Sequence, residues 1–270
     1  MTTIRYHIEE LIPYINWIYF FHAWGVREAQ APELKKEAEE LLQQWSRDEE
    51  KSTIFRAVLF KANSSEDDII LYADGKQGNN PTVSTTLPGS NLVRLPMLRQ
   101  QRPPYLCLAD FLPPSGMEPQ TMGLFASTVP FEVHGLMEQT LSDRLAEATA
   151  ERGHEEIRKR IWGYSPKENL TPQELFAEHY QGKRPAVGYP SLPDQSINFI
   201  IGKLLDFQSI GISLTENGAM LPHASTSGLM LSHPQCRHFS IGVIGEDQLY
   251  DYAGRRGIDA ELLRRFLEIQ

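Results

Sequence analysis

The sequence predicts an α+β protein whose largely antiparallel, twisted sheet is flanked by helices, in a single domain that spans residues 1–270. The first observation is the order of the patterns: helices and strands come in unequal runs rather than as alternating β-α-β units, which argues against a doubly wound parallel sheet. The second is continuity, since the 270 residues contain no long polar linker and no internal repeat. The third is composition: 41% hydrophobic and 23% charged residues are typical of a globular protein with a large core.

The first part of the chain combines an aromatic segment, a helix and a hairpin. Residues 15–26 include five aromatic rings within eight positions, which fits either a buried anchor or a platform for a ligand. Apolar residues at helical spacing predict an amphipathic helix over residues 31–51. Residues 53–62 and 67–72 are apolar and β-branched and flank a polar turn at 63–66, so we expect a hairpin there.

The middle of the chain alternates loops with apolar segments. Residues 76–91 and 113–120 are rich in turn-forming residues and are expected to be surface loops. Residues 105–112 and 121–129 are predicted to be buried strands. The longest helical pattern follows over residues 131–162.

A second helix is predicted to begin at Thr171. Thr171 can cap the helix, Pro172 suits its first position, and Glu174 completes a capping box. The last third is then expected to contain three helices and several strands. The helices are predicted over residues 196–206, 246–256 and 259–269, and the strands near 212–221, 227–233 and 238–244.

Charge and cysteine usage restrict the function classes. The net charge of −9 and the isoelectric point near 5.4 make nucleic acid and anionic membrane surfaces unfavourable partners. Two cysteines are too few for a disulfide scaffold and fit a reducing compartment, so we expect a cytoplasmic protein. The most apolar stretch, residues 11–26, is interrupted by polar residues and is shorter than the roughly 20 residues of a spanning helix.

Common catalytic and metal motifs are missing from the sequence. It contains no G-x-G-x-x-G, P-loop, H-E-x-x-H, C-x-x-C or G-x-S-x-G pattern. His233, Cys236 and His238 are three possible zinc ligands within six positions. Pro234 favours a tight turn, however, and no fourth ligand is near in sequence, so a turn between strands is the preferred interpretation. We expect no metal site and assign no catalytic residue.

The most informative segment is Arg184-Pro-Ala-Val-Gly188-Tyr189-Pro190. Its prolines fix the backbone, its small residues allow a ligand to approach the main chain, and an arginine can bind a carboxylate through two parallel hydrogen bonds. A structural loop with a surface arginine is the alternative interpretation of this pattern alone.

This segment resembles the R-P-A-x-G-Y-P loop in the activation domain of cobalamin-dependent methionine synthase. The resemblance extends in the same order over nearly the whole chain. Its further blocks are Tyr14-Ile-Asn-Trp17 with Phe20-Phe21 and Trp24, Tyr105 with Leu108-Ala-Asp-Phe111, Asp143-Arg-Leu-Ala-Glu147-Ala, Trp162-Gly-Tyr164 with Glu168-Asn-Leu170, Tyr180-Gln-Gly182, Leu214-Thr-Glu216 with Ala219-Met220, Ala224-Ser225 with Ser227-Gly228, and Ser232-His-Pro234.

The resemblance implies the activation-domain fold and a site for S-adenosylmethionine that lies over a corrinoid during reactivation by one-electron reduction and methyl transfer. It implies that Arg184 holds the ligand's carboxylate and that the backbone around Ala186 and Gly188 receives the adenosyl part. Tyr189 would face the ligand and the corrinoid, and Glu147 matches the family's acidic site residue. These roles are chemically consistent, because a sulfonium cation favours carboxylates and aromatic faces.

Two further candidate binding residues depart from the family pattern. Asn16 stands where the family usually has Asp; it keeps an acceptor oxygen but lacks the charge that attracts the ligand's ammonium group. His238, followed by Phe239, stands where the family has Tyr, and its imidazole can still stack or donate a hydrogen bond. Both departures fall on the expected ligand site.

The homocysteine, folate and cobalamin domains of the full-length enzyme have no counterpart in this sequence. The expectation is therefore a stand-alone reactivation module of a split methionine synthase, which acts on a separate cobalamin-binding chain with a flavodoxin-like or other electron donor. One alternative is a chaperone-like protein that docks on corrinoid proteins without methyl transfer. Another is an unrelated small-molecule enzyme on the same fold.

Overall fold

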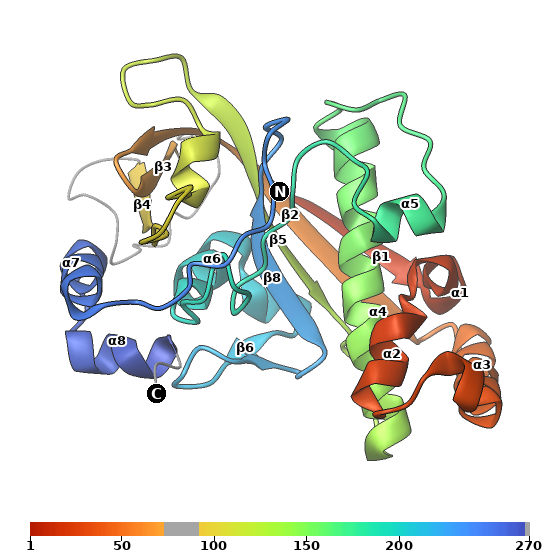
Figure 1. Cartoon of the computed structure of the whole chain (residues 1–270). Helices are drawn as coiled ribbons and strands as arrows, with labels where there is room; N and C mark the ends of the chain where they lie inside the picture. The colour runs from red at the N-terminus through yellow and green to blue at the C-terminus, as the bar shows by residue number, and fades with distance from the viewer. Residues whose placement is uncertain (73–91, 268–270) are drawn as a thin grey trace.

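Figure 1 shows the computed structural model of the chain, which describes residues 1–72 and 92–267. The loop predicted over residues 76–91 and the end of the helix predicted over residues 259–269 lie outside the described residues. None of the helices in the described ranges is both long and apolar enough to cross a lipid bilayer.

The described residues form a six-stranded antiparallel sheet and a separate two-stranded hairpin. The strands of the sheet are β1 (Thr2–His7), β2 (Ser52–Ser65), β3 (Asp68–Tyr72), β4 (Leu92–Pro96), β5 (Gln120–Thr128) and β8 (Ser225–Met230). Their order is β4-β3-β2-β5-β8, and β1 pairs with the first half of β2, on the side where β3 pairs with its second half. The hairpin consists of β6 (Ser213–Leu214) and β7 (Met220–Leu221). The α+β class and the antiparallel sheet are as predicted.

Helices cover both faces of this sheet (Figure 1). Side chains alternate along β2, so Phe55 and Ala57 point to one face and Ile54 and Val58 to the other. Helix α4 (Gly135–Glu156) packs on the first face and α6 (Ile197–Leu205) on the second. The N-terminal helices α1 (Ile8–Leu11), α2 (Trp17–Ala23) and α3 (Pro32–Ser46) lie on the α4 side, and α7 (Glu246–Arg256) and α8 (Ala260–Phe266) lie beyond the β4 edge on the other.

The helix predictions hold with shifted ends. Helix α4 continues into a π-helical turn, Ile157–Ile161, so the predicted helix over residues 131–162 contains a change of winding. The capping box at the start of α5 (Pro172–Phe176) is present: the Thr171 hydroxyl accepts the Glu174 N–H at 3.3 Å, and the Glu174 carboxylate accepts the Thr171 N–H at 2.8 Å.

Two strand predictions are wrong. Residues 105–112 contain a 3₁₀ turn, Leu108–Phe111, because the Asp110 carboxylate accepts the Cys107 N–H at 2.8 Å and caps that turn. Residues 238–244 are irregular. They do not pair with a strand of the described residues; the Ile241 N–H donates to the Pro190 carbonyl at 2.9 Å instead.

Several strands differ from the prediction in length or were missed. The strand expected over residues 212–221 is split by a turn into β6 and β7. Strand β2 runs on through Ser65, so the β2-β3 hairpin turns at residues 66–67. Strands β1 and β4 were not predicted from the sequence. Both pair with one strand only, and their sequences show weak alternation because an outer strand of a sheet is partly exposed.

The aromatic segment, residues 15–26, contains both buried anchoring rings and exposed aromatic surface. It forms α2, in which Phe20 and Phe21 are buried against the α4 side of the core. Tyr19, in contrast, is 60% exposed and lines a cavity. The same short helix therefore anchors the N-terminal region and supplies an aromatic wall to the site.

Candidate functional site

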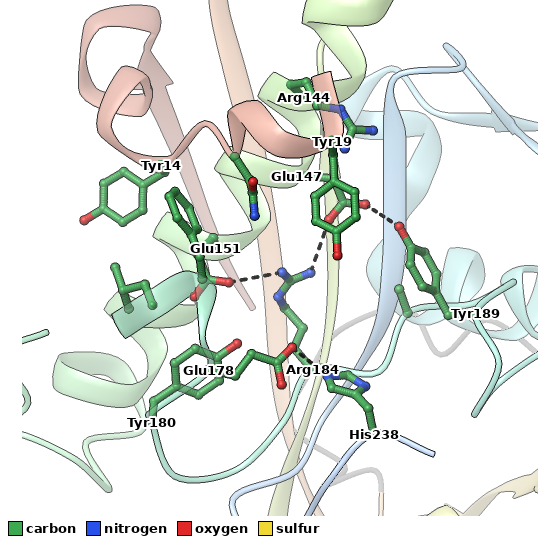
Figure 2. Close-up of a pocket in the computed structure, with 14 residues that line it drawn as sticks. Tyr14, Tyr19, Arg144, Glu147, Glu151, Glu178, Tyr180, Arg184, Tyr189 and His238 are labelled. Atoms are coloured by element: carbon green, nitrogen blue, oxygen red, sulfur yellow. Dashed lines mark hydrogen bonds and ion pairs between the residues drawn. The ribbon is translucent and has the colours of Figure 1, made fainter. Parts of the chain in front are cut away.

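A cavity of about 530 Å³ lies where α2, α4, α5 and the loop before α6 meet (Figure 2). Six of the seven predicted site residues line it: Asn16, Glu147, Arg184, Ala186, Tyr189 and His238. The remaining lining residues are Tyr14, Tyr19, Arg144, Glu151, Leu175, Phe176, Glu178 and Tyr180. The fold thus brings predicted residues from separate parts of the sequence around one space.

The Arg184 loop is held against strand β8 as an additional, short length of pairing. The Leu229 N–H donates to the Pro185 carbonyl and the Val187 N–H to the Ser227 carbonyl, both at 2.9 Å. Gly228 makes this approach possible, since a Cβ on that residue would lie 2.2 Å from the Pro185 oxygen. The backbone on either side of Ala186 is therefore fixed by the sheet.

Gly188 does not line the cavity but shapes the turn beside it. Its φ of +86° suits the third position of a type II turn, in which the Tyr189 N–H donates to the Ala186 carbonyl at 3.3 Å. The turn brings the half-exposed Tyr189 to helix α4, where its hydroxyl donates to Glu147 Oε1 at 2.9 Å. Gly188 orients the tyrosine, and its role as a backbone contact for a ligand stays a prediction.

Helix α4 supplies the charged wall of the cavity. Arg144, Glu147 and Glu151 are spaced three and four residues apart, so they share one face of the helix. Figure 2 shows Glu147 and Glu151 directed at the Arg184 guanidinium, and Arg144 above Glu147 on the same wall. Only Glu147 was predicted. Glu151 follows it at helical spacing, which is the signal that could have identified it.

Arg184 lies at the centre of the site and is held only loosely. Its Nη2 is 3.5 Å from Glu151 Oε2 and its Nη1 is 3.9 Å from Glu147 Oε2, longer than the 2.7–2.9 Å usual for a charge-assisted hydrogen bond. Its buried Nε finds no hydrogen-bond partner within the described part of the chain. Burial lowers the pKa of Arg184, but the facing carboxylates of Glu151 and Glu147 outweigh this and raise the pKa overall. The guanidinium is therefore charged and has donors to spare.

A third carboxylate, from Glu178, faces the cavity beside His238. His238 Nε2 lies 3.1 Å from Glu178 Oε1, and Lys183 Nζ lies 3.6 Å from Glu178 Oε2. Burial raises the pKa of Glu178, but the hydrogen bond from His238 and the charge of Lys183 lower it by more. The pKa therefore lies below its usual value, and the group is ionised at neutral pH. Sequence reasoning missed Glu178, whose position depends on where the chain leaves α5.

Asn16 faces the cavity with less freedom than its sequence suggested. It is the N-cap of α2, and its Oδ1 accepts the Ile18 N–H at 3.2 Å. One lone pair of the acceptor oxygen expected to serve a ligand is thus used by the helix. The second lone pair and the amide NH₂, a donor, remain.

The cavity carries a small excess of negative charge. Three carboxylates, from Glu147, Glu151 and Glu178, face two guanidinium groups, from Arg144 and Arg184, which leaves a net charge of −1 when His238 is neutral. Tyr14, Tyr19, Tyr180 and Tyr189 add aromatic surface to the same space. The arrangement suits a ligand with one carboxylate and an excess of positive charge.

The three possible zinc ligands do not come together. The Cys236 N–H donates to the His233 carbonyl at 3.0 Å, which makes the predicted turn, but the strand expected after it is missing. Burial raises the pKa of the Cys236 thiol to about 12. Within residues 1–72 and 92–267, no group of three or more His, Cys, Asp or Glu side chains could hold a metal ion.

Comparison with known proteins agrees with the fold. The family described as vitamin B12 dependent methionine synthase, activation domain, matches residues 7–257. Among solved structures, the chain is similar to the crystal structure of the MetH reactivation domain bound to AdoHcy, with 33% sequence identity and a TM-score of 0.84. That similarity covers 99% of this chain and 89% of the other.

Proposed function

Because the chain belongs to the activation-domain family of vitamin B12-dependent methionine synthase, we propose that it binds S-adenosylmethionine around Arg184 and takes part in reactivating cobalamin held by a partner chain. The observation that carries the proposal is the state of Arg184: it is largely buried, charged, loosely paired and placed in a cavity of net negative charge. AdoHcy, which the similar MetH domain binds, is the demethylated form of the proposed ligand.

The chemistry of the ligand matches the distribution of charge in the cavity. S-adenosylmethionine carries one carboxylate, one ammonium group and one sulfonium cation, hence a net charge of +1. Arg184 would bind the carboxylate through donors that Glu147 and Glu151 leave unused. These two carboxylates and Glu178 would face the two positive groups, and the tyrosine rings would offer their faces to the sulfonium.

The neutral parts of the ligand need a different surface. Ala186 is small, and its backbone is held by β8, so the adenosyl group can approach the main chain there. Tyr189 is half exposed and lies beside this stretch, so its ring would face both the ligand and the corrinoid. His238 would take the place of the family's tyrosine near the adenosyl side. The amide NH₂ of Asn16 would donate to an acceptor on the ligand.

The corrinoid supplies the cobalt centre that accepts the methyl group, and it would be bound by the partner chain. The residues of this chain bind and orient the methyl donor. Methyl transfer breaks the bond between sulfur and the methyl carbon, the electron pair stays on sulfur, and S-adenosylhomocysteine leaves. This product has lost the sulfonium charge, so a cavity of net negative charge would hold it less tightly than the substrate.

The proposed setting is cytoplasmic and requires two further proteins. One is a separate cobalamin-binding methionine synthase chain. The other is a flavodoxin-like or other electron donor, which an overall charge of −9 would direct to a local basic surface or to the partner. Neither nucleic acid nor a membrane has a part in the proposal, and neither does a metal ion held by this chain.

A second candidate function is a corrinoid-docking or chaperone-like protein that keeps the fold without methyl transfer. Asn16 favours it, because its oxygen caps α2 and it lacks the negative charge usual at this position. Calorimetry with S-adenosylmethionine separates the two candidates. The proposed function predicts saturable binding, whereas no heat and no thermal shift at millimolar ligand would favour the second.

Reactivation itself is tested by mixing. The chain, a methionine synthase chain that lacks this domain and holds inactive oxidised cobalamin, S-adenosylmethionine and a reductant are combined, and the absorbance of methylcobalamin is followed. We expect the absorbance to return only in the complete mixture. An equal return without this chain would contradict the reactivation function.

A further inference from the structure

A buried arginine lies directly behind the ligand site. Arg158, in the π-helical turn after α4, has a fully buried side chain. Its Nε and Nη2 donate to the Glu168 carboxylate at 2.9 and 2.7 Å, and its Nη1 donates to His154 Nδ1 at 2.8 Å. Its guanidinium carbon lies 3.9 Å from the centre of the Tyr180 ring. A charge so far from water is costly unless partners surround it, and here they do.

Arg158 also connects to the cavity through Glu151. Its Nη1 is 3.7 Å from Glu151 Oε1, while Glu151 Oε2 is 3.5 Å from Arg184 Nη2. Glu151 therefore lies between two guanidinium groups, one behind the wall and one in the cavity. Its Oε1 is buried and accepts no hydrogen bond from the described residues. Figure 2 shows the cavity side of this arrangement, with Glu151 directed at Arg184.

A carboxylate shared in this way attracts Arg184 without closing on it. With one cation as its partner, a buried carboxylate gains most by forming a short, two-point pair that uses up the guanidinium donors. With a cation on each side, the attraction is divided, and both pairs stay long. The donors of Arg184 then remain available for the carboxylate of a ligand.

We propose that Arg158 is a positioning residue for the ligand site, which acts through Glu151 to keep Arg184 open to the ligand's carboxylate. The inference rests on the proposed function, because the ligand is the one proposed above. Arg158 does not line the cavity, so its effect on the ligand would pass through Glu151.

The protonation of Glu151 is the property that reports this role. Three charged groups face it: Arg158 from the same helical run, Arg184 from the loop before α6, and Glu178 from the chain after α5. Tyr180 and His154 pack beside them and are uncharged at neutral pH, since burial raises the pKa of Tyr180 and lowers that of His154. Burial raises the pKa of Glu151, and the two guanidinium groups reduce this rise without cancelling it. Loss of Arg158 would raise the pKa further and leave ionised Glu151 with Arg184 as its one facing cation.

The test is the affinity for S-adenosylhomocysteine, measured by calorimetry between pH 5.5 and 8.5 and expressed as a ratio to the unmodified protein at each pH. For Arg158→Gln we expect the affinity to approach that of the unmodified protein as the pH is lowered, because protonation of Glu151 weakens its attraction for Arg184. At high pH we expect about a tenfold loss, because ionised Glu151 closes on Arg184. In the double variant Arg158→Gln/Glu151→Gln, the loss of affinity should no longer depend on pH. A loss that is equal at every pH, or no loss at all, would overturn the inference.

Two other variants serve as controls. Arg256→Gln breaks a buried arginine–carboxylate pair that is remote from the cavity, with Arg256 Nε 3.1 Å from Asp194; it should lower stability and leave the affinity profile unchanged. Glu168→Gln keeps the shape of the Arg158 partner and removes its charge, so Arg158 attracts Glu151 more strongly. We expect up to about threefold tighter binding, whereas a merely structural role for the cluster predicts weaker binding.

If Arg158→Gln fails to fold, Glu168→Gln alone tests the role of Arg158, because weaker binding in Glu168→Gln contradicts that role. The unmodified protein separates this inference from the proposed function. If it fails to bind S-adenosylhomocysteine and S-adenosylmethionine alike, the proposed function is wrong. If it binds and the variants behave as a merely structural cluster predicts, the role of Arg158 is wrong and the proposed function stands.

Discussion

Two buried arginine clusters lie on opposite sides of the sheet and use the same chemistry to different ends. On the α7 side, Arg256 donates to Asp194 at 3.1 Å and to Ser196 Oγ at 2.6 Å, and the Tyr252 hydroxyl donates to Asp194 at 2.8 Å. The other Asp194 oxygen accepts the Ser196 N–H at 2.8 Å. This cluster is closed: both carboxylate oxygens are occupied at ordinary hydrogen-bond distances.

The cluster on the α4 side is open. Arg184 has no carboxylate closer than 3.5 Å, and the buried Arg184 Nε, Glu151 Oε1 and Arg144 Nε have no partner among the described residues. An unsatisfied buried polar group costs about 1–3 kcal/mol. Open donors and acceptors therefore lower stability, and a ligand that occupies them recovers that energy. The comparison teaches that the completeness of an ionic cluster separates a structural role from a binding role.

The largest effect is expected from breaking the closed cluster. Arg256→Met leaves Asp194 buried without its cation, so the free energy of unfolding should fall by about 3–5 kcal/mol. Urea unfolding measures this. The folded fraction should bind S-adenosylmethionine as tightly as the unmodified protein. Weaker binding by the folded variant would show that the two clusters are coupled.

Breaking the open cluster should affect ligand binding more than stability. Arg184→Ala removes the proposed carboxylate contact, and the affinity for S-adenosylmethionine should fall by about 1.5–3 kcal/mol, the range for a hydrogen bond to a charged group. The free energy of unfolding should change less than in Arg256→Met, because the ion pairs of Arg184 are long. Arg160→Ala, at an exposed arginine paired with Glu156, is the matched control. Unchanged binding in Arg184→Ala would refute the assignment.

Two tyrosines sharpen the same comparison. Tyr252→Phe removes a buried donor from Asp194, so stability should fall by about 1–2 kcal/mol without a change in affinity. Tyr189→Phe removes the half-exposed donor to Glu147, so stability should change by less than about 0.5 kcal/mol. Its effect should appear in S-adenosylmethionine affinity. Equal stability losses in the two variants would mean that Tyr189 also belongs to the structural framework.

Much of the fold followed from local patterns, and the two wrong strand predictions trace to particular hydrogen bonds. The helix spacing, the β2-β3 hairpin and the capping box at Thr171 depend on neighbouring residues and were predicted correctly. Residues 105–112 and 238–244 are apolar enough for strands, but a strand also needs a partner. In the first segment Asp110 caps a 3₁₀ turn, and in the second the hydrogen bond of Ile241 goes to Pro190, far away in sequence.

Six of the seven residues predicted for the site line the cavity, and their roles in ligand binding stay predictions. Arg184, Ala186 and Tyr189 come from a single segment, and the structure places all three at the cavity. Glu151 and Glu178 were missed, because their direction toward the cavity depends on how α4 and the chain after α5 pack against that loop. Their contribution to ligand binding stays a prediction, as does the division of the chain into a single domain.

The smallest effect is expected from a substitution at Asn16, which stands where the family usually has Asp and which caps helix α2. Its Oδ1 caps α2 by accepting the Ile18 N–H at 3.2 Å, so the amide offers the cavity its NH₂ donor and one remaining acceptor lone pair. Asn16→Asp can keep the cap, because Asp and Asn serve equally well as N-caps, and its second oxygen adds a negative charge to the cavity. S-adenosylmethionine binding should therefore tighten, by no more than about 1 kcal/mol because the position is partly solvated. S-adenosylhomocysteine keeps the ammonium group but lacks the sulfonium charge. Its affinity should increase by less than that of S-adenosylmethionine if the added charge acts through the field of the cavity. The two affinities should increase equally if the added charge pairs with the ammonium group alone. Calorimetry with both ligands distinguishes these cases. Weaker binding of both would show that the Asn16 NH₂ donates to the ligand and that this donor, absent from Asp, matters more than the added charge.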